Sequence, residues 1–242
     1  MPAQRQHAFS EKVSLITDGA SPIGRAVAMQ LALAGSYVIV GVPKISEGDK
    51  RALDELKSLG TLANYFEVDV STIEGVKELV SEVENSYGHL DLLINCLKYE
   101  GDSEFENTSS GDFDQIVDSN LKNVFFMIQE SLRLMKPRPK PKIVNVISAC
   151  DTEKIEGNTA FVAASLALKG MTKNLAKVLP KKFRINAVEL SEIEKTKAKN
   201  KELDSELFRV KKELDEDDAA RTIIYLLSSD SIGINGQTLF VE

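Results

Sequence analysis

The chain has 242 residues, with 30 Lys and Arg against 37 Asp and Glu, and its formal net charge is −7. An acidic chain without a basic block is a poor match for nucleic acid or for an anionic membrane surface. Two Cys and two His at scattered positions exclude a disulfide framework and a zinc site, so we expect no metal.

The chain also lacks the features of a membrane or exported protein. No apolar run reaches the roughly 18 residues that a membrane span needs. The opening residues, MPAQRQHAFSEK, are polar and lack the apolar core of a signal peptide. We therefore expect a cytoplasmic protein with one domain over residues 1–242 and a polar tail over residues 1–11.

Apolar runs alternate with segments of helical spacing along the whole chain. In chain order, the first half predicts a strand at Val13–Thr17, a helix at Pro22–Ala34, a strand at Tyr37–Gly41, a helix at Asp49–Leu59, a strand at Leu62–Val68, a helix at Ser71–Tyr87 and a strand at Leu92–Asn95. The second half predicts a helix at Phe113–Met135, a strand at Ile143–Ile147, a helix at Thr159–Leu179, a strand at Phe183–Val188, a helix at Asp217–Ser228 and a strand at Gln237–Val241. Several of these strands are nearly all apolar, as in strands that are covered on both faces. The pattern predicts an α/β fold, a parallel sheet with helices on both sides.

One stretch departs from this alternation. Residues 189–218 are dense in Lys and Glu, and their apolar residues recur at roughly helical spacing. We expect this charged variable segment to be a solvated helix with one apolar stripe.

The first strand leads into Thr17-Asp-Gly-Ala-Ser-Pro-Ile-Gly24, at the turn where a doubly wound sheet binds a dinucleotide pyrophosphate. Further motifs are Phe66-Glu-Val-Asp69-Val70, His89-Leu-Asp91-Leu-Leu-Ile-Asn95, Asp118-Ser-Asn120, Lys142–Ser148, Arg184-Ile-Asn186 and Gly236-Gln237. With these motifs the chain resembles the short-chain dehydrogenase/reductase (SDR) family, most closely its beta-ketoacyl reductase branch, from Lys12 to Val241. The resemblance implies a Rossmann-type sheet of seven parallel strands in the order 3-2-1-4-5-6-7.

The resemblance places the cofactor contacts at Thr17, Ser21, Ile23, Gly24, Lys44, Asp69, Val70 and Asn95. The family's phosphate loop is Thr-Gly-x-x-x-Gly-x-Gly, but here Asp18 and Pro22 stand at the first two glycines. A carboxylate at Asp18 repels phosphate, although Asp tolerates the left-handed backbone of such a turn. Gly19 could serve as the first glycine in a shifted register. Ser21-Pro22 is typical of a helix N-cap followed by Pro at the first helical position.

The residue at the end of the second predicted strand also differs from the residue that the family has there. NAD-dependent members carry an Asp there, but this chain has Val42, and Lys44 two residues later could meet a 2′-phosphate. After the fourth strand, Leu97 and Lys98 replace a small Ala-Gly pair. We therefore expect either no cofactor or weak NADP(H) binding.

The catalytic positions of the family are Asn, Ser, Tyr and Lys. Here Asn120 and Ser148 are retained, whereas Phe161 stands at the Tyr and Ser165 at the Lys. Phe has no proton to transfer, and general acid catalysis contributes typically ~10²–10⁴-fold. Lys169, one turn further along the same helix, could reach back toward the missing Lys.

These departures indicate a pseudoenzyme, an SDR-fold protein that acts by binding a partner subunit or a ligand. The alternative is an NADP(H)-dependent ketoacyl-type oxidoreductase with an atypical active site. The helices at Phe113–Met135 and Thr159–Leu179 correspond to the family's dimer interface. We expect a homodimer or homotetramer, or a hetero-oligomer with an active SDR homologue.

Overall fold

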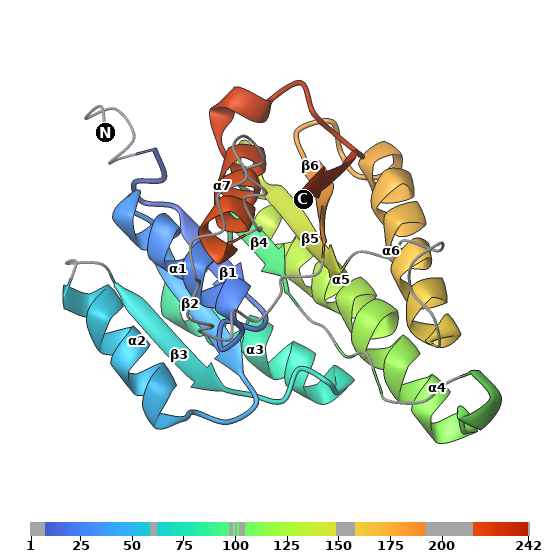
Figure 1. Ribbon diagram of the computed structural model, residues 1–242. Helices are drawn as coiled ribbons and strands as arrows, with labels where there is room; N and C mark the ends of the chain where they lie inside the picture. The colour runs from blue at the N-terminus through green and yellow to red at the C-terminus, as the bar shows by residue number, and fades with distance from the viewer. Residues whose placement is uncertain are drawn as a thin grey trace, which may run out of the picture.

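The apolar runs of the sequence form one parallel sheet with helices packed on both faces (Figure 1). The computed structural model describes residues 8–58, 62–96, 99, 101, 105–148, 158–191 and 215–241. The strands are β1 (Val13–Ile16), β2 (Tyr37–Val42), β3 (Ala63–Glu67), β4 (Leu92–Asn95), β5 (Lys142–Ser148), β6 (Arg184–Leu190) and β7 (Thr238–Val241). Their order is β3-β2-β1-β4-β5-β6-β7 and all pairs are parallel, as predicted.

The helices fall on two sides of this sheet. They are α1 (Pro22–Leu33), α2 (Glu47–Ser58), α3 (Ile73–Tyr87), α4 (Ser110–Val117), α5 (Asn123–Met135), α6 (Thr159–Val178) and α7 (Glu216–Leu227). One buried cluster joins α1, α2 and α7 to one face of the strands, and a second cluster joins α3, α5 and α6 to the other. Alternate strand residues therefore enter different cores, as in β1, where Leu15 packs with α3 and α5 and Ile16 packs with α1. Burial on both faces explains why these strands are so apolar.

The segment predicted as one helix from Phe113 to Met135 is interrupted, so that prediction was wrong. A π-helical turn at Asp118–Lys122 separates α4 from α5. Within it, the Asn120 side chain donates a hydrogen bond to the Ile116 carbonyl (2.8 Å). The Asn123 N–H bonds the Asp118 carbonyl, five residues back. Hydropathy spacing could not show this bulge, because one extra residue in a turn barely changes the apolar pattern.

Two predicted boundaries also shift. The residues described within the predicted polar tail include Phe9, which is buried against α1 and β2 in the first core, and its N–H bonds the Ala34 carbonyl (3.0 Å). At the other boundary, Glu189 and Leu190 complete β6 rather than beginning the charged segment. Most of that segment, residues 192–214, lies outside the described residues, as does Cys150.

Candidate functional site

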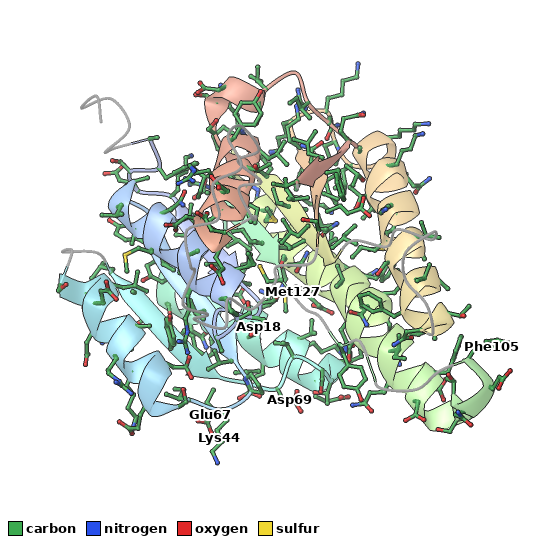
Figure 2. All side chains as sticks on the ribbon, in the orientation of Figure 1. Asp18, Lys44, Glu67, Asp69, Phe105 and Met127 are labelled. Atoms are coloured by element: carbon green, nitrogen blue, oxygen red, sulfur yellow. The ribbon has the colours of Figure 1, made fainter. Side chains whose placement is uncertain are left out.

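Of the residues that the resemblance assigns to cofactor and catalysis, Thr17, Asn95 and Ser148 lie at the carboxyl ends of β1, β4 and β5. In this strand order the chain changes direction between β1 and β4, and open α/β sheets bind ligands at such a point. Figure 2 shows Asp18 in the middle of this edge, between the first residues of α1 and the body of the sheet. The site therefore lies where the fold predicts it.

The phosphate loop is built as an ordinary helix start. Ser21 is the N-cap of α1, and its Oγ accepts a hydrogen bond from the Gly24 N–H (3.1 Å) and donates one to the Asp18 carbonyl (2.7 Å). Pro22 takes the first helical position. Gly24 is required by packing, because a Cβ there would lie 2.0 Å from the Asp18 carbonyl oxygen. The third glycine of the motif thus keeps its structural role.

The first half of the loop departs from the expectation of a left-handed turn. Asp18 and Gly19 both keep negative φ angles, since the described residues with positive φ lie elsewhere. Gly19 is needed for another reason, because a Cβ there would meet Val40 of β2 at 2.1 Å. The shifted glycine therefore serves close packing on the sheet and does not act as a conformational hinge.

The Asp18 carboxylate lies close to the backbone of its own loop. The backbone N–H groups of Ser21 and Ala20 hydrogen-bond it, and Arg25 attracts it. Burial nevertheless outweighs these contacts, and the nearby charge of Asp49 adds to burial, so the pKa of Asp18 is raised. This carboxylate thus lies beside the N–H groups of Ala20 and Ser21, two of the loop donors that would otherwise face a ligand.

A polar cluster that we did not predict lies beside this loop. The Arg25 guanidinium donates to Asp49 Oδ1 (2.8 Å), and Ser46 donates to Asp49 Oδ2 from both its N–H (2.8 Å) and its Oγ (2.5 Å). Burial raises the pKa of Asp49, but the bonds from Ser46 and Arg25 outweigh burial and lower it. Among the described residues, the hydroxyl of Tyr65 and Nε of Arg25 are buried without a partner. The Ser46-x-x-Asp49 spacing, typical of a capping box, was the available signal for this helix start.

Thr17 and Asn95 hold the strands together. Thr17 is fully buried, and its Oγ1 accepts from the Cys96 N–H (3.1 Å) across the β1–β4 boundary. Asn95 donates to Asn145 Oδ1 (2.8 Å), and Asn145 donates in turn to Thr172 of α6 (2.9 Å). The Asn95 side chain is thus committed to a buried network beneath the edge, and its Oδ1 has no partner among the described residues.

Cys96 is buried, and burial raises the pKa of its thiol, helped by the charge of Asp18. This thiol is therefore not a reactive nucleophile.

The remaining predicted cofactor residues serve local structure. Asp69 is exposed, and its Oδ1 accepts from the Ser71 N–H (3.0 Å) in the turn before α3. Val70 and Ile23 are buried in opposite cores. Lys44 is exposed beyond β2, and Figure 2 shows its side chain pointing away from Asp18, close to Glu67.

The Asn120 side chain forms hydrogen bonds that link α4 to the segment of chain that follows β4. Its Nδ2 donates to the carbonyls of Tyr99 (2.6 Å) and Ile116 (2.8 Å), and its Oδ1 accepts from the Tyr99 N–H (3.0 Å). All of these bonds are to backbone. Asn120 thus lies in the π-helical turn between α4 and α5, with its amide hydrogen-bonded to backbone.

The position assigned to the catalytic Tyr is an apolar cluster. Phe161, 4% exposed, packs with Ile116, Ala160 and Ala164, and Tyr99 lies against them. Ser165, one turn along α6, is 3% exposed. The side chain that replaces the proton donor is therefore enclosed by hydrocarbon and by the ring of Tyr99.

Lys169 does not reach back toward Ser165. Its Nζ lies 2.6 Å from Glu189 Oε1 on β6, in a half-buried ion pair. The sequence assigned Glu189 to the charged segment, so its place on β6 hid this partner. Ser148 ends β5 opposite Leu190 of β6, at the edge where the resemblance puts it, and its side chain lies outside the described residues.

A seven-stranded parallel sheet of this order, with a capped loop after β1, defines a doubly wound α/β protein. The family model for short chain dehydrogenase matches residues 12–206, and the chain belongs to this family.

Relatives of the chain carry reductase and dehydrogenase names. It is 28% identical over 237 residues to the 3-oxoacyl-(acyl-carrier-protein) reductase FabG of Staphylococcus epidermidis, a match that covers 96% of this chain and 97% of that protein. It is 34% identical over 169 residues to a 3beta-hydroxysteroid dehydrogenase of Mediterraneibacter gnavus, which covers 69% of this chain and 60% of that protein.

Solved structures share the fold. A dehydrogenase/reductase from Sinorhizobium meliloti superposes with a TM-score of 0.86 at 22% identity, covering 98% of this chain and 96% of that one. A citronellol catabolism dehydrogenase of Pseudomonas aeruginosa gives 0.83 at 23% identity, covering 98% and 95%.

The described residues contain neither a metal-binding cluster nor a membrane-spanning helix. No group of three or more His, Cys, Asp or Glu side chains is arranged to hold a metal ion there. No helix in the described part of the chain is long and apolar enough to span a membrane.

Proposed function

We propose that this chain is a short-chain dehydrogenase that has lost hydride-transfer catalysis and acts as a binding subunit. The observation that carries the proposal is Phe161, which lies in an apolar cluster at the position where the family places its Tyr. A proton donor is needed for carbonyl reduction, and neither a phenyl ring nor the neighbouring Ser165 supplies an acid of suitable pKa. Lys169, the lysine one turn further along α6, is held in an ion pair with Glu189.

The phosphate loop supports the same proposal. A dinucleotide would need the loop's N–H donors, which the Asp18 carboxylate already accepts from, and it would bring two further negative charges beside Asp18 and Asp49. Pro22 removes one more N–H donor from the first turn of α1. These residues do not fit a pyrophosphate, so the proposal includes no bound NAD(P)H and no step through it.

The alternative is an NADP(H)-dependent ketoacyl-type oxidoreductase with an atypical active site. It is favoured by one observation, the relatives of the chain, which are a reductase and a dehydrogenase. It requires a dinucleotide to displace the Asp18 carboxylate from its loop. Binding and turnover therefore separate the two candidates.

The test is calorimetry with NADPH and NADH, followed by NADPH oxidation with acetoacetyl-coenzyme A. We expect no binding up to millimolar cofactor and no turnover above background for the natural chain. The matched variant carries Phe161→Tyr and Ser165→Lys. It should also remain inactive, because the loop would still exclude the cofactor. Micromolar NADPH binding with turnover that Ser148→Ala abolishes would establish the reductase instead.

We further propose that the chain assembles through α5 and α6. Phe125 on α5 and Leu166 on α6 are 41% and 45% exposed, and they lie on the two helices that the resemblance assigns to the dimer interface. A homodimer or homotetramer, or a hetero-oligomer with an active homologue, would cover them. Sedimentation should give a dimer or larger species at micromolar concentration, and Phe125→Glu with Leu166→Glu should give the monomer. A monomeric natural chain would contradict this assembly.

A further inference from the structure

Cationic side chains are segregated in the second half of the sequence. Residues 131–148 and 166–188 together contain eleven Lys and Arg and no Asp or Glu, whereas the whole chain has 30 against 37. The first segment includes Lys136-Pro-Arg138-Pro-Lys140-Pro-Lys142, and the second includes Lys181-Lys182-Phe-Arg184. Neither segment alone is a long basic block, which is why the composition pointed away from a polyanionic partner.

The fold brings the two segments together. The first connects α5 to β5 and the second connects α6 to β6, and β5 pairs with β6 from Lys142 opposite Arg184. The Lys182 ammonium donates to the Lys136 carbonyl, and the Arg184 N–H donates to the Pro141 carbonyl (3.1 Å). We call the resulting surface the basic edge, defined by Lys136, Arg138, Lys140, Lys181, Lys182 and Arg184, with Lys142 buried beneath it.

Few carboxylates face the basic edge. Asp91 accepts from Arg138 (2.8 Å) and Lys12 (3.2 Å), and Asp230 lies close enough to Lys142 to favour its charged form. Burial, together with the positive charges of Arg184 and Lys140, lowers the pKa of Lys142 to about 8. The local potential is therefore positive on a molecule whose net charge is −7.

The outermost cations of the basic edge have no acidic partner within the described part of the chain. Lys136, Lys140, Lys181 and Lys182 are exposed, and none forms an ion pair with a described carboxylate. By contrast, Arg133 and Lys169, from the same two segments, are paired with Glu84 and Glu189. Like charges held together in this way cost free energy unless an anion offsets them.

We propose that the basic edge binds an acidic segment of another protein. The prolines at 137, 139 and 141 restrict the backbone of the lysine-rich connection, which lowers the entropy lost on binding. Exposed apolar groups border the same edge: Val178 at the end of α6 is 68% exposed, and Ile232, whose carbonyl accepts from Arg184, is 52% exposed. A mixture of cations and aliphatic groups suits an acidic peptide with interspersed apolar residues.

Other polyanions fit this surface less well. No aromatic side chain belongs to the basic edge, so it offers no platform for stacking single-stranded bases. The net charge of −7 opposes the approach of a long phosphate polymer or an anionic bilayer, whereas a short acidic segment meets mainly the local positive charge.

The basic edge lies at the amino ends of β5 and β6, opposite the candidate site. In Figure 1 the connection from α6 to β6 is at the end of the sheet from which the strand arrows start, and the arrowheads point away from it. A partner there would leave the carboxyl edge free. The inference is thus independent of whether the chain binds NADPH, and either can fail without the other.

The test measures binding of a fluorescein-labelled deca-glutamate peptide by fluorescence anisotropy at low and at physiological salt. The variant carries Lys136→Glu, Lys140→Glu and Lys181→Glu. The matched control carries Lys50→Glu, Lys57→Glu and Lys77→Glu, which changes the net charge equally on exposed parts of α2 and α3. We expect the edge variant to lose affinity by about tenfold or more and the control to lose much less.

Two further measurements keep the result decisive. The milder pair Lys140→Gln with Lys181→Gln should weaken binding by a smaller factor while leaving circular dichroism and thermal unfolding unchanged. Equal loss in the edge variant and the control would overturn the proposal, because long-range charge alone would explain it. Tighter binding of an oligothymidylate or of phosphatidylserine vesicles, lost in the edge variant, would also overturn it and assign the surface to nucleic acid or membrane.

Discussion

The two edges of the sheet have opposite electrostatic character, and they differ in how their charges are satisfied. At the carboxyl edge lie Asp18, Asp49, Glu67, Asp69 and Glu189, and each of them has a partner within the fold. At the amino edge, Lys136, Lys140, Lys181 and Lys182 have no described carboxylate beside them. Among the described residues, the carboxylates at the edge that binds a phosphate-bearing cofactor in the family are thus paired within the fold, whereas four lysines at the opposite edge have no described carboxylate as partner.

This contrast teaches that the fold places a site but does not determine its ligand. A parallel sheet with this strand order makes a crevice at the carboxyl edge whatever side chains line it. The ligand depends on which donors and charges remain free. By that criterion the amino edge is the better candidate for recognising an anion.

The largest effect is expected from Phe161, which tests whether its place at the carboxyl edge is now structural. Phe161→Ala should lower the free energy of unfolding by about 3–5 kcal/mol, because it leaves a cavity among Ile116, Ala160 and Ala164. Urea unfolding measures this change. The control, Phe105→Ala, truncates a ring that is 71% exposed and should change stability little. Loss of less than about 1 kcal/mol at Phe161 would mean that the position is loosely packed and open to a ligand.

The next effect concerns Asp91, a buried carboxylate that forms ion pairs with Arg138 of the basic edge and with Lys12. Asp91→Asn should cost about 2–4 kcal/mol at pH 7, because Arg138 and Lys12 would lose a buried counter-charge. Burial raises the pKa of Asp91, but the bonds from Arg138, Val13 and Lys12 outweigh it and lower the pKa below 3.8. The carboxylate therefore stabilises the native state above pH 3.8, and this stabilisation is lost as the pH falls through the lowered pKa.

Chemical unfolding between pH 7 and pH 3 checks this prediction for Asp91. The difference between Asp91→Asn and the natural chain should shrink toward the acid end. The exposed Asp114→Asn on α4 is the control and should track the natural chain throughout. A constant difference across this range would assign the effect to packing rather than charge.

A smaller effect should appear at the phosphate loop. Asp18→Asn should raise NADPH affinity by about tenfold, equivalent to ~1.4 kcal/mol, because it removes one negative charge from beside the loop amides. The exposed Asp54→Asn on α2 removes the same charge at another place and should leave affinity unchanged. Calorimetry at low salt measures both. Equal NADPH affinities in the two variants would mean that the Asp18 carboxylate does not weaken NADPH binding to the loop.

The pH dependence gives an independent check at the same position. Because the native pKa of Asp18 is raised above 3.8, the native state binds this proton more tightly than the unfolded chain. Any NADPH binding by the natural chain should therefore strengthen as the pH falls through the raised pKa, and Asp18→Asn should abolish that trend.

The smallest effect at pH 7 is expected from Lys142. Its native pKa of about 8 lies below the ordinary 10.5, so the unfolded chain binds this proton more tightly. The natural chain should therefore gain stability as the pH rises from about 8 to 10.5, and Lys142→Met should lose that gain. At pH 7 the variant should differ by less than about 1 kcal/mol, because relief of the buried charge offsets the donor lost from the Ser228 carbonyl. Chemical unfolding across this range, with the exposed Lys140→Met as control, measures it.

Much of the fold could be predicted because it depends on local patterns. Apolar runs, the Ser21-Pro22 cap and the glycine after Tyr87 mark where elements begin and end. The Gly88 residue indeed has φ of 70° at the end of α3. The π-helical turn at Asp118–Lys122 could not be predicted in this way, since it depends on hydrogen bonds that Asn120 makes to Tyr99, far along the chain.

The candidate site could be predicted only in part, for the same reason. The sequence by itself determined which residues stand at the family's positions: Phe161, Ser165, Asp18 and Pro22. Only the tertiary structure decided where their side chains and charges are used. It turned the Asp18 carboxylate into its own loop, paired Lys169 with Glu189, and joined two short lysine-rich connections into one basic edge. Local sequence sets conformation within a few residues, whereas charges meet across strands that lie far apart in the chain.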